Sequence, residues 1–403
     1  MSYYPALLKK VFGAPMRYYQ GPGILATLTP KLIKGWGFKK PLIFSGKRTK
    51  AALERVGFFK ALEAEGIKYR FEGFGEGQPW GPECCDEEIE RLAKIGSQEG
   101  CDVVIAAGGG KALDTGKDVA NKMGVDVFIV PTIAAQDAPT SALSVVYTAE
   151  HVFKRYDFFD RHPLAVIVDS KVIAEAPARF LACGIGDAFS KFFEVYDCYR
   201  SGANNCVVKP EPGYTTLTAA NLSKLLYETL RTWGVEAMDS VEMNAVTPPL
   251  EAIIEANILL SGLAFESGGL SVAHAVYDGL TVVEEKMHPY QFHGELVHFG
   301  TCTQVVLEGY PKDIIFEVFK FGHEVGLPET FEEIGLKGIS DEDLWKVAEA
   351  TAKDPMIKNV FYEIDAEKVF FAMKGADAIG RRISKIVPRR PYELVKPSIP
   401  VPH

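Results

Sequence analysis

The hydrophobic pattern of this chain changes near Glu175, and the change limits the folds that its 403 residues can adopt. Before that point, short apolar runs rich in β-branched residues alternate with amphipathic helical stretches. The expected strands cover residues 41–46, 68–74, 102–109, 126–132, 142–148 and 164–170. Alternating strands and helices predict a parallel sheet covered by helices on both faces.

The pattern after Glu175 is helical, with long periodic segments at residues 177–202, 216–234 and 248–269. A chain of this length is expected to form two domains. We therefore predict an α/β nucleotide-binding domain over residues 1–178 and an all-helical, metal-binding domain over residues 179–403. The cleft between two domains is a common place for a site. The Pro-rich tail from Val387 onward is expected to be extended along the surface or poorly ordered.

Composition excludes several classes of function. The formal net charge of −9 disfavours nucleic acid and anionic membranes as partners. The sequence has no run of eighteen apolar residues, and its N-terminus lacks the pattern of a signal peptide, so we expect a cytoplasmic protein. Seven cysteines, with one vicinal pair and no CxxC pair, indicate neither a disulfide framework nor a structural zinc site.

A glycine-rich segment, DVVIAAGGGKALDTGKD, predicts a strand, a turn at Gly108–Gly110 and a helix that carries Asp114 and Lys117. Such a turn lets the backbone approach a pyrophosphate at the helix N-terminus. It is neither a P-loop nor a GxGxxG fingerprint. A tight turn that only requires positive φ is the alternative.

The next segment, residues 131–148, is rich in small and hydroxylic residues and has the character of a second cofactor-contacting loop. It contains Asp137, which is either a functional carboxylate or a residue that caps a turn.

Asp187, His274 and His293 offer one carboxylate and two imidazoles, a set that suits a divalent metal with an open coordination position. Histidines are locally dense here, because His288 and His298 flank His293. A lone histidine such as His274 is more often a hydrogen-bonded core residue. The residues alone therefore indicate a metal without settling which of them bind it.

Taken together, six segments identify a relationship: GGGKALDTGK, PTIAAQDAPTSALSVVYT, FKRY, APARFLACGIGD, SGLAFESGGLSVAHA and HGELVHFGT. They span residues 83–305, and in them the chain resembles the glycerol dehydrogenase branch of the iron-containing (group III) alcohol dehydrogenase superfamily. The resemblance implies a Rossmann-like N-terminal domain, a helical C-terminal domain (a dehydroquinate synthase-like fold) and a catalytic zinc. It places the metal on Asp187, His274 and His293, and Asp137 beside the substrate hydroxyls.

The same resemblance implies the residues that line the nicotinamide nucleotide: Gly109, Gly110, Lys111, Asp114, Thr132, Ala135, Ser141, Leu143 and Tyr147. The chain departs from the family after its first predicted strand, where glycerol dehydrogenases carry an acidic pair and this chain has Ser45, Gly46, Lys47 and Arg48. A missing carboxylate beside two cations favours NADP over NAD. The alternative is a basic surface turn.

Lys191 marks a second departure. Iron-using relatives have a histidine four residues after the ligand aspartate, on the same helix face, where this chain has Lys191. Only three ligands remain, which favours zinc over iron. Lys191 itself could receive an anionic substrate group, or it could point to solvent or pair with a nearby glutamate.

We therefore predict an NAD(P)-linked, zinc-dependent dehydrogenase or reductase that acts on a small polyol or vicinal diol and assembles as a homo-oligomer. The alternative is an NADPH-dependent reductase of a small anionic carbonyl compound, such as a 2-oxo acid or a sulfonated or phosphorylated aldehyde. A dehydroquinate-synthase-like lyase is less favoured, because between Ser261 and Gln304 the only basic residue besides histidine is Lys286.

Overall fold

A computed structural model describes residues 8–392 of the protein, which form two compact units. The α/β unit consists of Gly13–Ala176 and Ser240–Gly262. The helical unit consists of Pro177–Asp239 and the described parts of Met1–Phe12 and Leu263–His403. The Pro-rich segment expected to be extended lies outside the described residues from position 393 onward.

The predicted boundary at 178/179 falls two residues from one crossing between the units, but the chain also crosses at three other points. Residues 240–262 are mostly helical yet belong to the α/β unit, where Asn257 donates to the carbonyl of Ala134. Helical periodicity shows that a segment is a helix with an apolar face, and it does not show which unit covers that face.

The α/β unit is built on a six-stranded parallel sheet with the order β1-β8-β5-β4-β2-β3. The strands are β1 (Tyr18–Gly21), β2 (Pro41–Ser45), β3 (Arg70–Gly73), β4 (Val103–Gly108), β5 (Asp126–Pro131) and β8 (Ala165–Asp169). Every residue of β2, β4 and β8 is buried, as expected where both faces are covered. This confirms the predicted parallel sheet.

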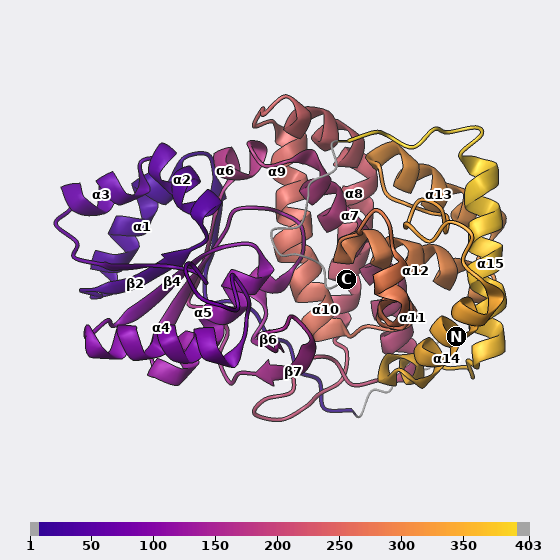
Figure 1. Ribbon diagram of the computed structural model, residues 1–403, viewed down its shortest axis with the longest axis horizontal. Helices are drawn as coiled ribbons and strands as arrows, with labels where there is room; N and C mark the ends of the chain where they lie inside the picture. The colour runs from indigo at the N-terminus through magenta and orange to yellow at the C-terminus, as the bar shows by residue number, and fades with distance from the viewer. Residues whose placement is uncertain (1–7, 393–403) are drawn as a thin grey trace. The chain divides into compact units, whose positions relative to one another are not determined.

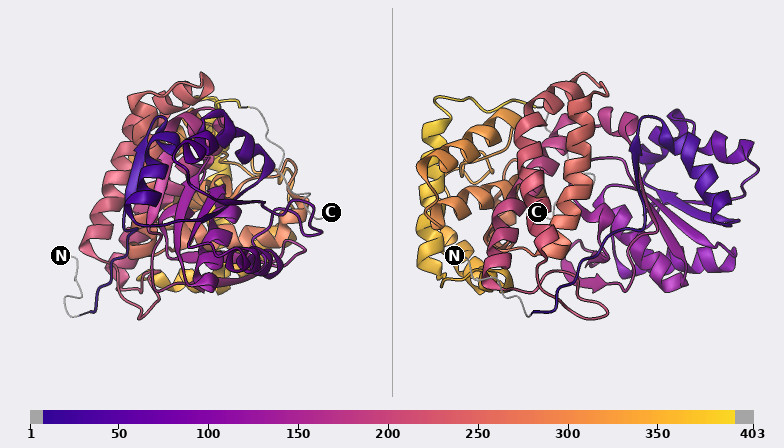
Figure 2. Two further views of the ribbon diagram at one scale, coloured as in Figure 1. Left: turned by 90° about the vertical axis from the view of Figure 1, so that its left-hand side faces the viewer. Right: turned by 180° about the vertical axis from the view of Figure 1, so that it is seen from behind.

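Helices cover both faces of this sheet. Figure 1 shows α1 (Ile24–Gly35), α2 (Lys47–Arg55) and α3 (Phe58–Ala64) on one face, and α4 (Asp86–Gln98) and α5 (Gly110–Met123) on the other. The reverse view in Figure 2 shows the same two layers. The core between α1–α3 and the sheet includes Leu25, Ile43, Phe58, Ile105 and Phe128.

The expected strand at 142–148 forms, but it is not part of the parallel sheet. It is β6 (Leu143–Tyr147), which pairs antiparallel with β7 (Phe153–Phe158) in a separate ribbon. Burial alternates along β6, so one face is covered, unlike the strands of the main sheet. β1 and β7 were not predicted, because β1 is a short edge strand and β7 has a largely polar, exposed sequence.

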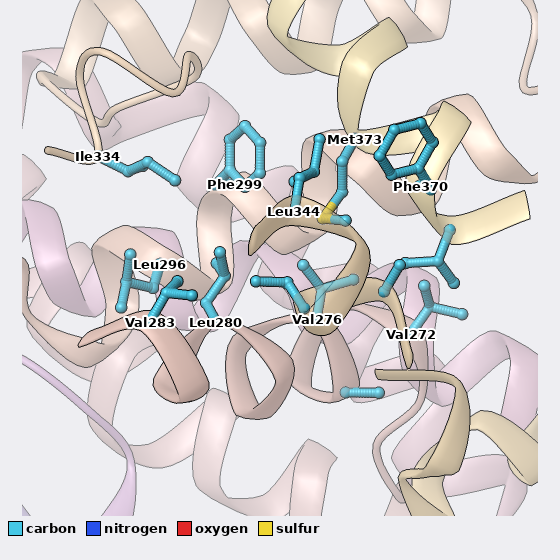
Figure 3. Close-up of a cluster of buried hydrophobic side chains, with 14 of the residues drawn as sticks. Val272, Val276, Leu280, Val283, Leu296, Phe299, Ile334, Leu344, Phe370 and Met373 are labelled. Atoms are coloured by element: carbon cyan, nitrogen blue, oxygen red, sulfur yellow. The ribbon is translucent and has the colours of Figure 1, made fainter. Parts of the chain in front are cut away.

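The helical unit contains no β-strand among the described residues from 179 to 392. Its helices are α7 (Ala178–Ser201), most of α8 (Leu217–Glu242), most of α10 (Ser261–Gly268), α11 (Val272–Leu280), α12 (His293–Leu307), α13 (Lys312–Val325), α14 (Asp341–Lys353) and α15 (Ala366–Ile383). Figure 3 shows Val272, Val276 and Leu280 in one row along α11, facing side chains of α12, α14 and α15. His274 lies two residues from Val272 and Val276, so it projects from the opposite side of α11.

One helix among the described residues, Pro248–Gly268, is long and apolar enough to cross a membrane by length and composition alone. It runs through α9 (Pro248–Glu255), a five-residue π-helix (Ala256–Leu260) and α10. Most of its apolar window is buried within the structure, as in the core helix of a globular protein.

Candidate functional site

The glycine turn stands where adjacent parallel strands end. β4 ends at Gly108, which has φ of 151°, and α5 begins at Gly110. Thr132, after β5, donates its backbone N–H to the carbonyl of Gly108 at 3.0 Å, and its hydroxyl lies 3.4 Å from that of Thr49. The carboxyl ends of β2, β4 and β5 therefore meet, as they do at the ligand-binding edge of doubly wound sheets.

The buried side chain of Lys117 on α5 holds residues 138–143, part of the predicted second cofactor-contacting loop, against that helix. Its ammonium donates to the carbonyls of Ala138 (2.6 Å) and Leu143 (2.7 Å) and to the hydroxyl of Ser141 (3.1 Å). It also pairs with the carboxylate of Asp114 at 3.1 Å. Sequence reasoning noted Lys117 without assigning it a role. The available signal was its place one turn after Asp114, on the buried face of the helix.

Lys111 and Tyr147 also lie together. The ammonium of Lys111 is 5.0 Å from the centroid of the Tyr147 ring and 2.5 Å from the carboxylate of Glu83. Glu83 is fully buried and contacts the imidazole of His151 at 2.7 Å. Asp114 accepts the backbone N–H of Val145 at 3.2 Å, and burial raises the pKa of its carboxyl. The structure thus gathers predicted nucleotide residues from α5 and β6 at one edge.

Asp137 and the basic turn belong to the same unit. The carboxylate of Asp137 is buried and accepts the hydroxyl of Ser261 at 2.7 Å. Ser45 is buried at the end of β2. Lys47 and Arg48 are exposed on the first turn of α2, where the helix N-terminus carries partial positive charge. Ala135 is partly buried on the loop that precedes Asp137.

The three predicted metal ligands converge in the helical unit. Asp187 comes from α7, His274 from α11 and His293 from the first residue of α12. The carboxylate oxygen Oδ1 of Asp187 lies 3.4 Å from His274 Nε2 and 3.7 Å from His293 Nε2. One ligand atom from each residue falls within 4.8 Å of the others.

These separations fit a tetrahedral cation. With metal–ligand distances of about 2.1 Å, two ligand atoms of a tetrahedral site lie about 3.4 Å apart. Asp187 and His274 are buried, whereas 39% of the His293 side chain is exposed. The exposed side of His293 is where a fourth, exchangeable ligand could approach.

Close contact between α7 and α12 puts Asp187 beside His293. A Cβ atom on Gly294 would overlap the carbonyl oxygen of Cys183, and one on Gly186 would overlap the carbonyl oxygen of Gly294. The glycine next to each ligand therefore lets the two helices approach. The sequence shows that glycines stand at these two positions, but only the contact between α7 and α12 explains why a side chain would not fit there.

A buried ion pair fixes the start of α12. Arg179 donates to both carboxylate oxygens of Glu295, at 2.8 and 2.7 Å, and to the carbonyl of Tyr290. Glu295 also accepts the backbone N–H of Phe292 and the hydroxyl of Tyr392. Neither Arg179 nor Glu295 was singled out from the sequence.

Glu194 orients His274 and was not predicted either. It stands two turns after Asp187 on α7 and is fully buried. Its carboxylate contacts His274 Nδ1 at 2.7 Å, which leaves Nε2 to face Asp187, the arrangement common around metal-binding histidines. Burial lowers the pKa of His274, but Glu194 and Asp187 outweigh burial and raise it to about 9.

Lys191 is buried beside Asp187 and His274, so it does not point to solvent. Its ammonium forms an ion pair with Asp187 Oδ1, lies 3.1 Å from the Asp187 carbonyl and is 3.4 Å from His274 Nε2. Burial raises the pKa of Asp187, yet Lys191 and the two histidines hold it well below its ordinary value. The ammonium of Lys191 thus already neutralises the carboxylate of Asp187, the acidic member of the three predicted metal ligands.

The predicted site residues therefore fall into two groups. The nucleotide residues and Asp137 belong to the α/β unit, and the metal donors with Lys191 belong to the helical unit. Lys286, the basic residue considered for the lyase alternative, pairs with Asp343 at 2.7 Å and is not in the donor group.

Comparison with known proteins gives consistent results. Residues 15–170 match the model of the iron-containing alcohol dehydrogenase family. The chain is 46% identical over 368 residues to a glycerol dehydrogenase from Thermotoga maritima, a match that covers 91% of this chain and 96% of that protein. It is 46% identical over 302 residues to a glycolaldehyde reductase from Halobacterium salinarum, covering 75% of this chain and 81% of that protein.

A solved structure agrees. The crystal structure of a probable glycerol dehydrogenase from Sinorhizobium meliloti superimposes with a TM-score of 0.81 at 37% identity, covering 93% of this chain and 99% of that one. This family is one of metal-dependent, NAD-linked dehydrogenases. The chain belongs to the iron-containing alcohol dehydrogenase family and is a glycerol dehydrogenase-like alcohol or polyol dehydrogenase.

Proposed function

We propose that the protein is a zinc-dependent, NADP-linked dehydrogenase that interconverts a small polyol or vicinal diol with its hydroxyketone or aldehyde. The observation that carries this proposal is the convergence of Asp187, His274 and His293 at separations that suit a tetrahedral cation. Three nitrogen and oxygen donors, with one ligand exposed, fit a catalytic zinc better than a closed structural one.

When bound, zinc supplies a Lewis acid that polarises the substrate oxygen and lets an alcohol lose its proton near neutral pH. The residues of the chain orient the reactants. Glu194 holds His274 in the tautomer that presents Nε2 to the metal. Asp137, a buried carboxylate held by Ser261, would accept a hydrogen bond from a substrate hydroxyl. Tyr277 packs edge-on against His293, with ring centroids 4.4 Å apart, and would fix that ring.

The nucleotide would lie at the edge formed by β2, β4 and β5. The turn of Gly108–Gly110 presents backbone N–H groups to a pyrophosphate. Lys47 and Arg48 stand at the N-terminus of α2, just beyond Ser45 at the end of β2. Two exposed cations on a helix N-terminus favour the 2′-phosphate of NADP. NAD is the alternative nucleotide.

The substrate is proposed to be neutral. The ammonium of Lys191 is already paired with the carboxylate of Asp187. It would therefore attract an anionic substrate group less strongly than an unpaired lysine would. The alternative is a reductase of a small anionic carbonyl compound, for which Lys191 would have to leave Asp187. The lyase alternative would need basic side chains beside the metal ligands. Lys286, the residue considered for that role, pairs with Asp343 instead.

We further propose that the protein is cytoplasmic and forms a homo-oligomer, with no nucleic-acid or membrane partner. The net charge of −9 supports the absence of anionic polymer partners. The cysteines of the described residues are all free thiols, which fits a reducing compartment.

The decisive experiment measures steady-state rates with zinc, with NADH or NADPH, and with glycerol, dihydroxyacetone, glycolaldehyde, 2-oxobutanoate and a sulfonated aldehyde. We expect turnover of the neutral compounds, with NADPH preferred. A preference for the anionic compounds that is lost in Lys191→Ala would support the alternative. Equal kcat/KM for both nucleotides, unchanged in Lys47→Ala and Arg48→Ala, would refute the role of the basic turn.

A second arm tests the ligand assignment. His274→Ala should lose the catalytic zinc and at least 100-fold of kcat, because removing one of three ligands leaves too few donors. Full activity in this variant would contradict the proposed metal centre.

A further inference from the structure

A second group of side chains of types that can bind a metal, none of them shared with the Asp187 group, lies buried in the helical unit. His298 and Cys302 stand one turn apart on α12, and Glu329 lies in the segment after α13. One ligand atom from each residue falls within 4.8 Å of the others, and all three side chains are fully buried. A fourth buried side chain, His323 of α13, contacts the carboxylate of Glu329 at 3.2 Å.

The distances fit metal coordination. His298 Nε2 lies 3.2 Å from Glu329 Oε1 and 3.7 Å from Cys302 Sγ. In a tetrahedral zinc site, with bonds of about 2.1 Å to N or O and about 2.3 Å to S, two N or O ligands lie about 3.4 Å apart and N and S about 3.6 Å.

Hydrogen bonding within the group leaves buried polar atoms unsatisfied. His323 Nδ1 lies 2.9 Å from the carbonyl of Val387, which can only accept, so Nδ1 carries the proton. Its Nε2 then lies 3.2 Å from Glu329 Oε2 and 3.5 Å from Glu333 Oε1, yet neither His323 Nε2 nor Glu329 Oε2 forms a hydrogen bond within the described residues. Buried polar atoms without partners are costly, and a cation between them would satisfy both.

The backbone makes room for the group. A Cβ atom on Gly322 would overlap both His298 Nε2 and Glu329 Oε1. α13 therefore passes the cluster with a glycine at the point of contact, and every ligand atom is shielded from solvent.

We propose that His298, Cys302, His323 and Glu329 bind a second divalent cation, a structural zinc. Two nitrogen donors, one sulfur and one oxygen are a set that zinc accepts, and four protein ligands leave no open position for catalysis. A thiolate and a carboxylate balance the two positive charges of the ion. Its binding would displace the thiol proton of Cys302 and tie α12 to α13. This site is independent of the proposed catalytic centre.

Cobalt substitution distinguishes the two sites, because the catalytic donors include no sulfur. The full-length protein is stripped with a chelator, reloaded with Co²⁺ and examined by near-ultraviolet absorption. We expect a thiolate-to-cobalt charge-transfer band in wild type and in His274→Ala. The band should be absent from Cys302→Ala and present in Cys198→Ala, which removes another fully buried thiol of the same unit.

Metal analysis of zinc-loaded protein provides a second readout. Wild type should hold one more equivalent of zinc per chain than Cys302→Ala, and His274→Ala should lose the other equivalent. If Cys302→Ala does not fold, Glu329→Gln serves in its place. A single equivalent in wild type that His274→Ala abolishes, with no thiolate band, would overturn the second site.

Discussion

At the scale of single residues, Asp187 carries the proposed metal centre and Lys191 modifies it. Asp187 is buried and close to three nitrogen atoms, those of His274, His293 and Lys191. Two of these nitrogens could share a metal with the carboxylate, while the third carries its own positive charge. A divalent cation must therefore displace the Lys191 ammonium or tolerate it nearby.

Lys191→Ala should increase the affinity for zinc at the Asp187 site by about tenfold or more, because it removes a cation beside the metal position and leaves the Asp187 carboxylate only the two histidines as partners in the metal-free protein. Competition with a chromophoric chelator measures the affinity. Lys224→Ala, which removes an exposed lysine on α8, is the matched control and should change nothing. A weaker affinity in Lys191→Ala would mean that Lys191 supports the metal.

The pH dependence of metal binding should follow His274, whose pKa of about 9 lies above the ordinary 6.5. Below about pH 9 the metal-free imidazole carries a proton that the metal must displace, so affinity should rise with pH and level off near 9. Glu194→Gln removes the main cause of the raised pKa, so the plateau should begin at lower pH. The same change should weaken binding about 10- to 100-fold by loosening His274.

Isothermal titration in buffers of different ionisation enthalpy counts the protons released. Glu228→Gln, on the surface of α8, is the control and should leave the profile unchanged. A binding constant independent of pH between 6 and 9 would rule out a protonated His274 in the metal-free protein.

At the scale of elements, the site depends on how closely helices approach. α7 and α12 touch at Gly186 and Gly294. Two turns after Asp187 on α7, the carboxylate of Glu194 contacts His274 on α11. The helices themselves are stabilised elsewhere, by the row of Val272, Val276 and Leu280 shown in Figure 3. Core packing on one side of α11 thus positions His274, a proposed metal ligand, on the other.

Gly294→Ala should destabilise the protein by about 1–3 kcal/mol and weaken metal binding, because the new methyl group would overlap the carbonyl of Cys183 and push His293 away from Asp187. Chemical denaturation and metal titration measure the two effects. Gly35→Ala at the end of α1 is the control, since a Cβ there meets nothing within 4 Å. Equal free energies of unfolding for the two variants would show that α12 shifts to accommodate the methyl group without loss of stability.

At the scale of the whole molecule, the predicted nucleotide residues and the predicted metal ligands belong to different units. The nucleotide residues lie at the carboxyl edge of the parallel sheet, and both metal groups lie in the helical unit. Each ligand should therefore stabilise its own unit first, by an amount set by its concentration relative to its dissociation constant.

Hydrogen exchange should show this division. Adding zinc to stripped protein should protect amides of α7, α11 and α12, while adding NADPH should protect the turn at Gly108–Gly110 and residues 131–148. At 100 times the dissociation constant, each ligand contributes about 2.7 kcal/mol. Protection of the β4–α5 turn by zinc alone would contradict the separation of the two sites.

The sequence by itself determined the elements and the residue types. Strand–helix alternation and helical periodicity depend on local burial patterns, so the five main predicted strands of the sheet and the helical nature of the second half could be read directly. The resemblance to a family supplied Asp187, His274 and His293, and the structure brings these three together.

Only the tertiary structure decided which distant residues meet. Glu194 and Arg179 act through contacts far along the chain, and no local pattern distinguishes them from other buried charges. Residues 240–262 belong to the α/β unit because of the partner against which their apolar face packs. Helical periodicity shows that such a face exists but does not identify its partner. His298 and Cys302 stand one helical turn apart, but Glu329 lies far along the chain, so the cluster follows from the packing of α12 against α13 and the segment that follows it.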